Sequence, residues 1–184
     1  MNVIASSGQL RASLLRWALV LVPSTLLLGL LSGRLAGSGP DSAWFMALVK
    51  PAAYPPPAAF GIVWSILYVL MGIACAMVAS ARGAPGRGVA LAAFVVQFVL
   101  NLAWSPLFFA AHMLTGSLIL IVLIDIAVAT TIVLFHRVRP VAAYLLIPYL
   151  LWVLFATYLN WAFLDANPAL DGVEVSGAVQ RIEF

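Results

Sequence analysis

Three long apolar stretches of this chain carry aromatic and amide side chains at intervals of three or four residues. The three ladders are Trp64, Tyr68, Met71 and Cys75, then Gln97, Asn101, Trp104 and Phe108, and finally Tyr149, Trp152, Ala156 and Asn160. This spacing places the members of each ladder on one face of a helix. Aromatic rings can stack on a flat apolar ligand, and amides can orient it through hydrogen bonds. The ladders therefore predict an internal site with aromatic walls, and ordinary packing between the helices is the alternative.

The class of protein follows from the composition. Hydrophobic residues make up 65% of the chain and charged residues 8%, and the mean hydropathy is +1.12. Such a chain has too little polar surface to cover a soluble fold, which indicates an integral membrane protein. Lipid tails offer no hydrogen-bond partners, so the amides of the ladders should turn toward other helices or a ligand.

Five stretches are long enough to cross a bilayer, which takes about 20 residues. We expect spans from Leu14 to Leu31, Ala58 to Ser80, Val89 to Ala111, Thr115 to Phe135 and Val141 to Leu164. The predicted fold is an all-α membrane protein, a five-transmembrane-helix bundle with a long proline-rich loop between helices 1 and 2. Its domain plan is a segment 1–13, a membrane domain 14–167 and a tail 168–184. A signal peptide is the alternative for the first span, but its apolar run is long and no clear cleavage pattern follows it.

The connection from Ser32 to Pro57 is longer than the others and includes four prolines between Pro51 and Pro57. The prolines exclude a continuous helix, whereas a short helical turn from Asp41 to Val49, capped by Asp41 or Ser42, fits the sequence. Ordered loops of this length are usually functional. We interpret this one as a lid over the site.

The placement of basic residues predicts the topology. Arg11, Arg16, Arg82, Arg87, Arg137 and Arg139 fall on one side of the expected spans, and only Arg34, Lys50 and Arg181 on the other. The positive-inside rule then places the amino terminus in the cytoplasm and the carboxyl terminus outside. The basic residues are scattered and form no stripe interleaved with aromatics, so we expect no nucleic-acid partner.

Chemistry by side-chain nucleophiles or metals is not indicated. Two histidines and one cysteine on different spans give no metal-ligand spacing, so neither a catalytic residue nor a metal ligand is predicted. Asp125 lies deep in a span and is either a packing group or a proton-linked site. His112 is expected at the interface, with haem ligation as the alternative. Gly72, Ala76 and Ser80 form a row of small residues, which indicates close helix packing.

Three motifs give the chain a family resemblance. They are Lys50-Pro51, Pro55-Pro56, Val63-Trp64 and Leu67-Tyr68-x-x-Met71-Gly72, then Gln97-x-x-x-Asn101-x-x-Trp104-x-Pro106-x-Phe108-Phe109, and last Pro148-Tyr149-Leu150-x-Trp152-x-x-Phe155-Ala156-x-x-Leu159-Asn160. In order and position they resemble the TspO/MBR family of translocator proteins (peripheral benzodiazepine receptors) and bacterial tryptophan-rich sensory proteins. The resemblance implies a five-helix bundle in a bacterial membrane that frequently forms a homodimer. It also implies a pocket beneath the first loop that binds porphyrins such as protoporphyrin IX or haem, sterols and synthetic aromatic ligands, with no obligatory cofactor.

Carried over to this sequence, the family's motifs assign ligand-binding and lid residues. The ligand-binding residues are Trp64, Tyr68, Asn101, Trp104, Trp152, Ala156 and Asn160, and the lid residues are Lys50, Pro51, Ala53, Tyr54, Pro55 and Pro56. Ala53 stands where the resemblance would place a tryptophan implicated in light-dependent porphyrin breakdown. Its absence argues against that activity here. The pattern proposed for sterol recognition also lacks its basic residue after Leu159, so cholesterol is not the expected ligand.

The function predicted from the sequence is therefore a membrane receptor or carrier for a tetrapyrrole or a similar flat apolar molecule, with a regulatory or sensory role. Two alternatives remain. One is a transporter of porphyrins or sterol-like molecules, although no internal repeat with broken helices is evident. The other is a light-dependent porphyrin-degrading enzyme, which Ala53 disfavours.

Overall fold

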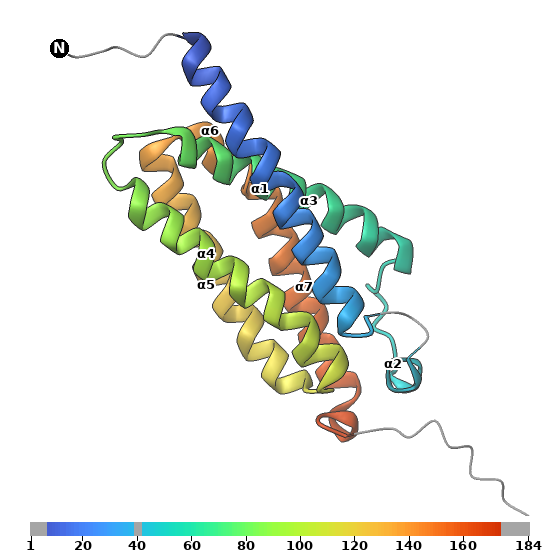
Figure 1. Ribbon diagram of the computed structural model, residues 1–184. Coiled ribbons are helices and arrows are strands. Elements are labelled where there is room, and N and C mark those ends of the chain that lie inside the picture. Colours follow the sequence, from blue (N-terminus) through green and yellow to red (C-terminus); the bar gives the residue numbers. More distant parts are fainter. Residues whose placement is uncertain (1–6, 39–41, 174–184) are drawn as a thin grey trace, which may run out of the picture.

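The computed structural model describes residues 7–38 and 42–173, and within these ranges the chain folds into helices without strands (Figure 1). The long helices are α1 (Ser7–Leu35), α3 (Pro57–Ser80), α4 (Arg87–Ser105), α5 (Leu114–Val138) and α7 (Ile147–Ala166). The shorter ones are α2 (Ala43–Ala47), the π-helix η1 (Pro106–Ala110), α6 (Pro140–Tyr144) and the 3₁₀-helix η2 (Pro168–Leu170). Five helical segments are long and apolar enough to span a membrane, which confirms the predicted fold class.

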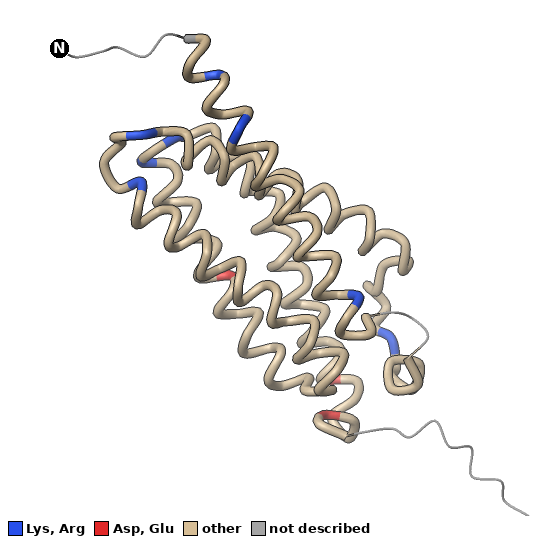
Figure 2. The backbone as a smooth tube through the Cα atoms, viewed as in Figure 1, with Lys and Arg blue, Asp and Glu red and all other residues tan. Residues whose placement is uncertain are grey.

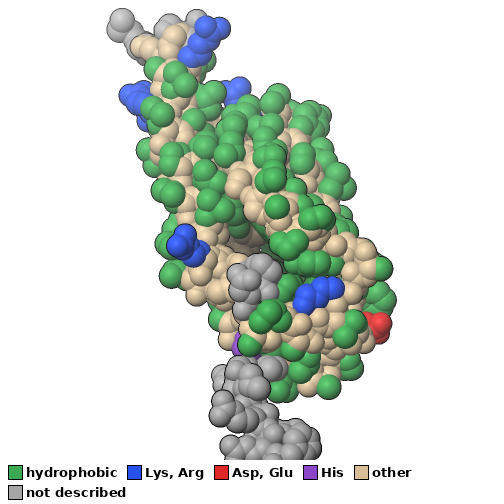
Figure 3. All heavy atoms as spheres, turned by 90° about the vertical axis from the view of Figure 1, so that its right-hand side faces the viewer, with side chains coloured by type: hydrophobic (Ala, Val, Ile, Leu, Met, Phe, Trp, Pro, Cys, Tyr) green, Lys and Arg blue, Asp and Glu red, His purple; other side chains and the backbone are tan. Residues whose placement is uncertain are grey.

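The outer surface of the bundle is apolar, as a bilayer requires. Large hydrophobic side chains stand exposed along the spans, among them Leu19, Leu27, Ile62 and Ile126. Figure 3 shows hydrophobic side chains over most of the face it presents. In water this surface would be an extended apolar patch, whereas in a membrane it contacts lipid tails.

The fifth span is not the continuous helix that the sequence predicts. A turn at Leu145 and Leu146 separates α6 from α7. Pro148 explains this break, because proline has no N–H to donate to the carbonyl of Tyr144 and its ring clashes with that carbonyl. The segment still crosses the bundle, so the number of spans is unchanged.

The third span also departs from a uniform α-helix, since it ends in η1. Pro106 begins this π-helical turn, and the N–H of Ala111 donates to the carbonyl of Pro106 at 2.9 Å, five residues back. A π-turn inserts one extra residue and rotates the side chains that follow it. Phe108 is consequently buried under the lid while Phe109 lines the cavity described below.

α1 and α3 pack closely against each other over an extensive contact. Thr25 Oγ1 donates to the carbonyl of Tyr68 at 2.9 Å. An ideal Cβ placed on Gly72 would lie 2.6 Å from Cα of Val22 and 2.7 Å from Thr25 Oγ1. Only glycine allows the two backbones to approach this closely, so Gly72, the first residue of the row of small residues, serves close helix packing.

The basic residues gather at the two ends of the bundle (Figure 2). One end of the bundle holds the start of α1, the α3–α4 connection and the α5–α6 connection. Six arginines lie there: Arg11, Arg16, Arg82, Arg87, Arg137 and Arg139. Arg34 and Lys50 lie at the opposite end with α2, and Arg181 falls outside the described residues.

This asymmetry predicts a cytoplasmic amino terminus and an external carboxyl terminus. In a bacterial host, an alkaline phosphatase fusion at Phe184 is expected to be active and a green fluorescent fusion there to stay dark. The same reporters inserted after Gly83, in the short α3–α4 connection, provide the opposite control. An inactive phosphatase fusion and a fluorescent green fusion at Phe184 would show that the topology is the reverse of the predicted one.

Candidate functional site

A cavity of about 610 Å³ lies inside the bundle beneath α2. All five spans contribute residues to its wall. They are Gly29 and Gly33 from α1, Trp64 from α3, Asn101 from α4 and Phe109 from η1, Ile121 from α5, and Val153 from α7. Small-molecule sites in proteins commonly enclose about 300–1,000 Å³. Gly29 on α1 makes room for the ring of Tyr68, since an ideal Cβ on this glycine would lie 2.2 Å from that ring.

Five of the seven predicted ligand-binding residues line this cavity: Trp64, Tyr68, Asn101, Trp104 and Ala156. The rings of Trp64 and Tyr68 stack, with centroids 5.3 Å apart. The Tyr68 hydroxyl donates to Asn101 Oδ1 at 3.1 Å, which fixes both side chains across the α3–α4 contact. The cavity wall is thus a pre-organised surface of aromatic rings with a few polar atoms.

Asn160 does not line the cavity but lies directly behind it. Its Oδ1 accepts a hydrogen bond from Trp104 Nε1 at 3.2 Å, and its Nδ2 donates to the carbonyl of Leu114 at 3.0 Å. The side chain is almost completely buried, at 1% exposure. Asn160 therefore orients the Trp104 indole, and direct contact with a ligand stays a prediction.

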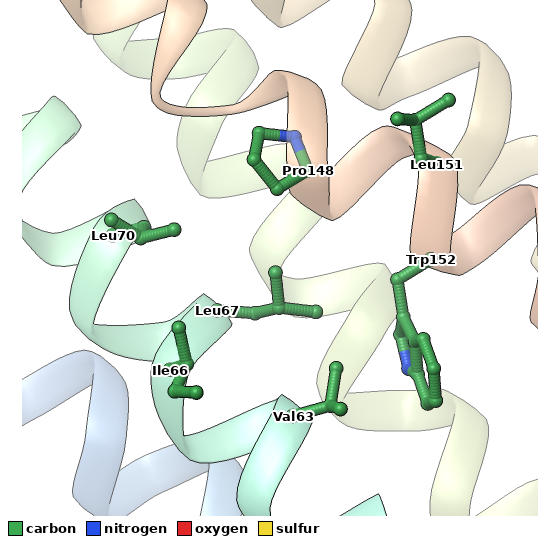
Figure 4. Close-up of a pocket in the computed structure, with 7 residues that line it drawn as sticks. All are labelled: Val63, Ile66, Leu67, Leu70, Pro148, Leu151 and Trp152. Carbon is green, nitrogen blue, oxygen red and sulfur yellow. The ribbon is translucent and has the colours of Figure 1, made fainter.

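Trp152 lies one layer outside the cavity. Its ring packs edge-on against Phe60, a cavity residue, with centroids 5.9 Å apart. On its other side it borders a groove between α3 and α7 lined entirely by apolar side chains, including Leu67 and Pro148 (Figure 4). Trp152 Nε1 is buried and has no hydrogen-bond partner among the described residues. The structure thus separates Trp152 from the other aromatic wall residues.

Part of the loop predicted as a lid lines the cavity, and the role of a lid stays a prediction. Ser42 caps α2 by accepting a hydrogen bond from the N–H of Phe45 at 3.1 Å, whereas Asp41, the other predicted cap, lies outside the described residues. Phe45 and Tyr54 line the cavity, and their rings lie 5.9 Å apart. Burial raises the pKa of the Tyr54 phenol, so this group is neutral at physiological pH.

The remaining lid residues shape the loop rather than the cavity wall. Lys50 Nζ donates to the carbonyls of Leu48 (2.9 Å) and Phe45 and lies over the Phe45 ring, and burial lowers its pKa. The N–H of Tyr54 closes a turn onto the carbonyl of Pro51 at 2.9 Å. Pro55 and Pro56 lead into α3, while Ala53 is exposed and does not line the cavity.

Two residues that the sequence did not single out as anchors hold the lid to the far end of α7. Asn167 is buried, and its amide both accepts from the N–H of Val49 at 2.7 Å and donates to the carbonyl of Val49 at 3.0 Å. Trp44 is 2% exposed and donates through Nε1 to the carbonyl of Leu170 at 3.2 Å. These contacts join segments more than 100 residues apart, so helical spacing could not indicate them.

Asp125 and His112 lie away from the cavity wall. Asp125 on α5 accepts a hydrogen bond from Thr157 Oγ1 on α7 at 2.8 Å, and a proton-linked role stays a prediction. The ring of His112 stacks on the indole of Trp44, with centroids 4.6 Å apart. Trp44 therefore covers one face of the imidazole. In residues 7–38 and 42–173 no three His, Cys, Asp or Glu side chains are grouped as metal ligands would be.

Comparison with known proteins agrees with this architecture. A family model described as the TspO/MBR family matches residues 19–165. The chain is 41% identical over 130 residues to the tryptophan-rich protein TspO of Chlorobaculum tepidum, a match covering 70% of this chain and 82% of that protein. It is 37% identical over 147 residues to the human translocator protein, covering 79% and 87% respectively. It is also 37% identical over 127 residues to protein CrtK of Rhodobacter capsulatus, covering 68% and 79%. Five apolar spans, the enclosed aromatic cavity and these matches identify the chain as a multi-pass membrane protein that belongs to the TspO/MBR family.

Proposed function

We propose that this protein is a membrane receptor for a flat tetrapyrrole such as protoporphyrin IX or haem, which it binds in the cavity beneath the lid. Ligand occupancy would be read out as a regulatory or sensory signal. The observation that carries the proposal is the wall itself, where rings from the lid and from three segments of the bundle, Tyr54, Phe60, Trp64, Trp104 and Phe109, surround one cavity.

The chemistry of this wall matches a planar conjugated ligand. Aromatic faces and edges offer stacking and edge-to-face contacts that are worth about 0.5–1.5 kcal/mol each beyond the burial of area. Asn101 and Ser105 add polar atoms to an otherwise apolar surface, which suits the few hydrogen-bonding groups of such a molecule. A homodimer, as the resemblance implies, is also part of the proposal.

A titration tests this proposal directly. Protoporphyrin IX added to the purified protein in detergent micelles is expected to show saturable binding, followed by the shift of its strongest absorbance band. Empty micelles and an unrelated membrane protein in the same detergent measure partitioning. Binding that rises linearly with micelle concentration and never saturates would exclude the tetrapyrrole.

Bound porphyrin is expected to survive illumination, because Ala53 offers neither a polarisable face nor an oxidisable group. Ala53 itself is exposed and does not line the cavity, but the longer indole of the variant Ala53→Trp can reach from the lid toward the ligand. The variant should therefore speed the loss of the porphyrin absorbance band under light, while changing affinity by no more than a stacking increment of about 0.5–1.5 kcal/mol. Free porphyrin in detergent is the control for uncatalysed bleaching.

Tyr54 gives this prediction its sharpest counter-test. Its phenol lines the cavity and is the nearest oxidisable group in the lid. Rapid bleaching by the wild-type protein that is abolished by Tyr54→Phe would show that tyrosine performs the electron transfer, and the enzyme interpretation would then replace the receptor.

A further inference from the structure

Arg34 brings a positive charge to the mouth of the cavity. It lies in the last turn of α1, where it lines the cavity together with Gly33 and Ser38. Its side chain is exposed and makes no hydrogen bond or ion pair with any of the described residues. The described residues that line the cavity include no acidic side chain to neutralise it. Within residues 7–38 and 42–173, the five donors of its guanidinium therefore have no partner.

Two other basic side chains, by contrast, bind backbone carbonyls within the protein. Lys50, at the same end of the bundle, binds the carbonyls at the end of α2. Arg87, at the opposite end, donates twice to the carbonyl of Ala79, at 2.8 and 3.1 Å. Figure 3 shows basic side chains on either side of a hollow near the lid. Arg34 thus lines the cavity and has guanidinium donors that none of the described residues uses.

The cavity is polar at one end and apolar at the other. Arg34 and Ser38 lie at the lid end of α1, whereas Ile121 and Ile124 on α5 and Val153 on α7 supply aliphatic wall at the depth of the spans. An ionised group at that depth would lose its hydration without finding a partner. A ligand that carries an acid therefore has one favourable orientation, with its acidic edge at the lid and its apolar edge inside.

We infer that Arg34 binds a carboxylate on the edge of the ligand and so selects flat aromatic acids over neutral molecules of the same shape. This inference rests on the proposed function and names the chemical class that the site prefers. A guanidinium pairs with a carboxylate through two parallel N–H···O hydrogen bonds, which gives direction as well as charge attraction. Arg34 is then a specificity-determining residue rather than only a marker of topology.

Two probes that share one ring and differ in the charge of its side chains test this inference. Protoporphyrin IX carries two carboxylates, and its dimethyl ester keeps the ring but is neutral. In the wild-type protein the diacid should bind about fivefold or more tightly than the ester, after correction for partitioning into micelles, as expected for a charge-assisted pair at a solvated mouth. Arg34→Gln should remove most of this difference by weakening the diacid alone, and Arg34→Lys should restore part of it.

The matched control is Arg16→Gln, which removes the same charge from the other, exposed end of α1 and should leave both affinities unchanged. Raising the salt concentration should weaken binding of the diacid to the wild type but not to Arg34→Gln. An equal loss for diacid and ester in Arg34→Gln would overturn the inference while leaving the proposed function standing. Saturable binding of neither probe to the wild type would overturn both.

Discussion

Replacing Gly72 with alanine is expected to destabilise the bundle, although alanine is the better helix former. The added methyl group would lie 2.6 Å from the backbone of Val22 and 3.0 Å from the carbonyl of Leu21. Backbone atoms cannot move aside as a flexible side chain can, so α1 must shift away from α3. Overpacking of a close contact typically costs about 1–3 kcal/mol. The shift would also strain the hydrogen bond from Thr25 Oγ1 to Tyr68.

Gly61 provides the matched control, because it lies in the same helix and an added Cβ there meets nothing within 4 Å. Gly61→Ala should raise stability by up to about 0.5–1 kcal/mol, since glycine lowers the stability of helices. The measurement is the midpoint of thermal unfolding in one detergent, followed by tryptophan fluorescence. A lower unfolding midpoint for Gly72→Ala together with a higher one for Gly61→Ala would confirm the tight α1–α3 contact. A Gly72→Ala protein with an unchanged midpoint would show that the helices lie farther apart.

The fold was largely predictable because a bilayer imposes a length and a polarity on every span. Hydropathy located all five membrane segments, but it averages over many residues and does not see local breaks. The presence of a proline does not by itself show where a helix breaks either. Pro23 lies inside an unbroken α1, where Ser24 Oγ donates to the carbonyl of Val20 at 2.7 Å, whereas Pro148 separates α6 from α7. Whether a proline ends a helix depends on packing, which a single sequence does not contain.

The candidate site was predicted well in character and less well in detail. Ladder spacing identified the faces that turn inward, and five of seven residues do line the cavity. The fifth-span ladder shows the limit: Tyr149 is fully buried and bonded to Gln97, Ala156 meets the cavity, and Asn160 lies behind Trp104. One helix face can border packed core and open cavity in turn, and only the arrangement of its neighbours decides which.

Residues at the lid end were the hardest to assign from the sequence. In the sequence Arg34 is only one of the charges that set topology, because nothing in its spacing connects it to the aromatic ladders. Asn167 follows the last span and belongs to none of the ladders, yet it holds Val49 of the lid. Both positions depend on where a long loop returns to the bundle, which is a tertiary contact without a periodic pattern.

The cavity geometry distinguishes two tryptophans that the ladders treated alike. Trp104→Ala is expected to weaken protoporphyrin IX binding by at least about tenfold, which corresponds to 1.4 kcal/mol. The variant removes a ring from the wall, and with it the stack on Phe108 at 4.9 Å. It also leaves Oδ1 of the buried Asn160 without its donor. Trp152→Ala should weaken binding by less than about threefold, because Trp152 reaches the cavity only through Phe60 and its removal takes no ring from the cavity wall.

Both variants should be titrated against the porphyrin absorbance band, since loss of a tryptophan would change the protein's own fluorescence. Trp161→Ala is the control for removal of an indole, because Trp161 is 51% exposed on the outer face of α7. Unfolding midpoints measured in parallel separate weaker binding from loss of fold. If Trp152→Ala weakens binding as much as Trp104→Ala while its stability is unchanged, the ligand must extend past Phe60 toward the α3–α7 groove. The buried, unpartnered Nε1 of Trp152 would then be a ligand donor, and the site would be larger than the cavity beneath the lid.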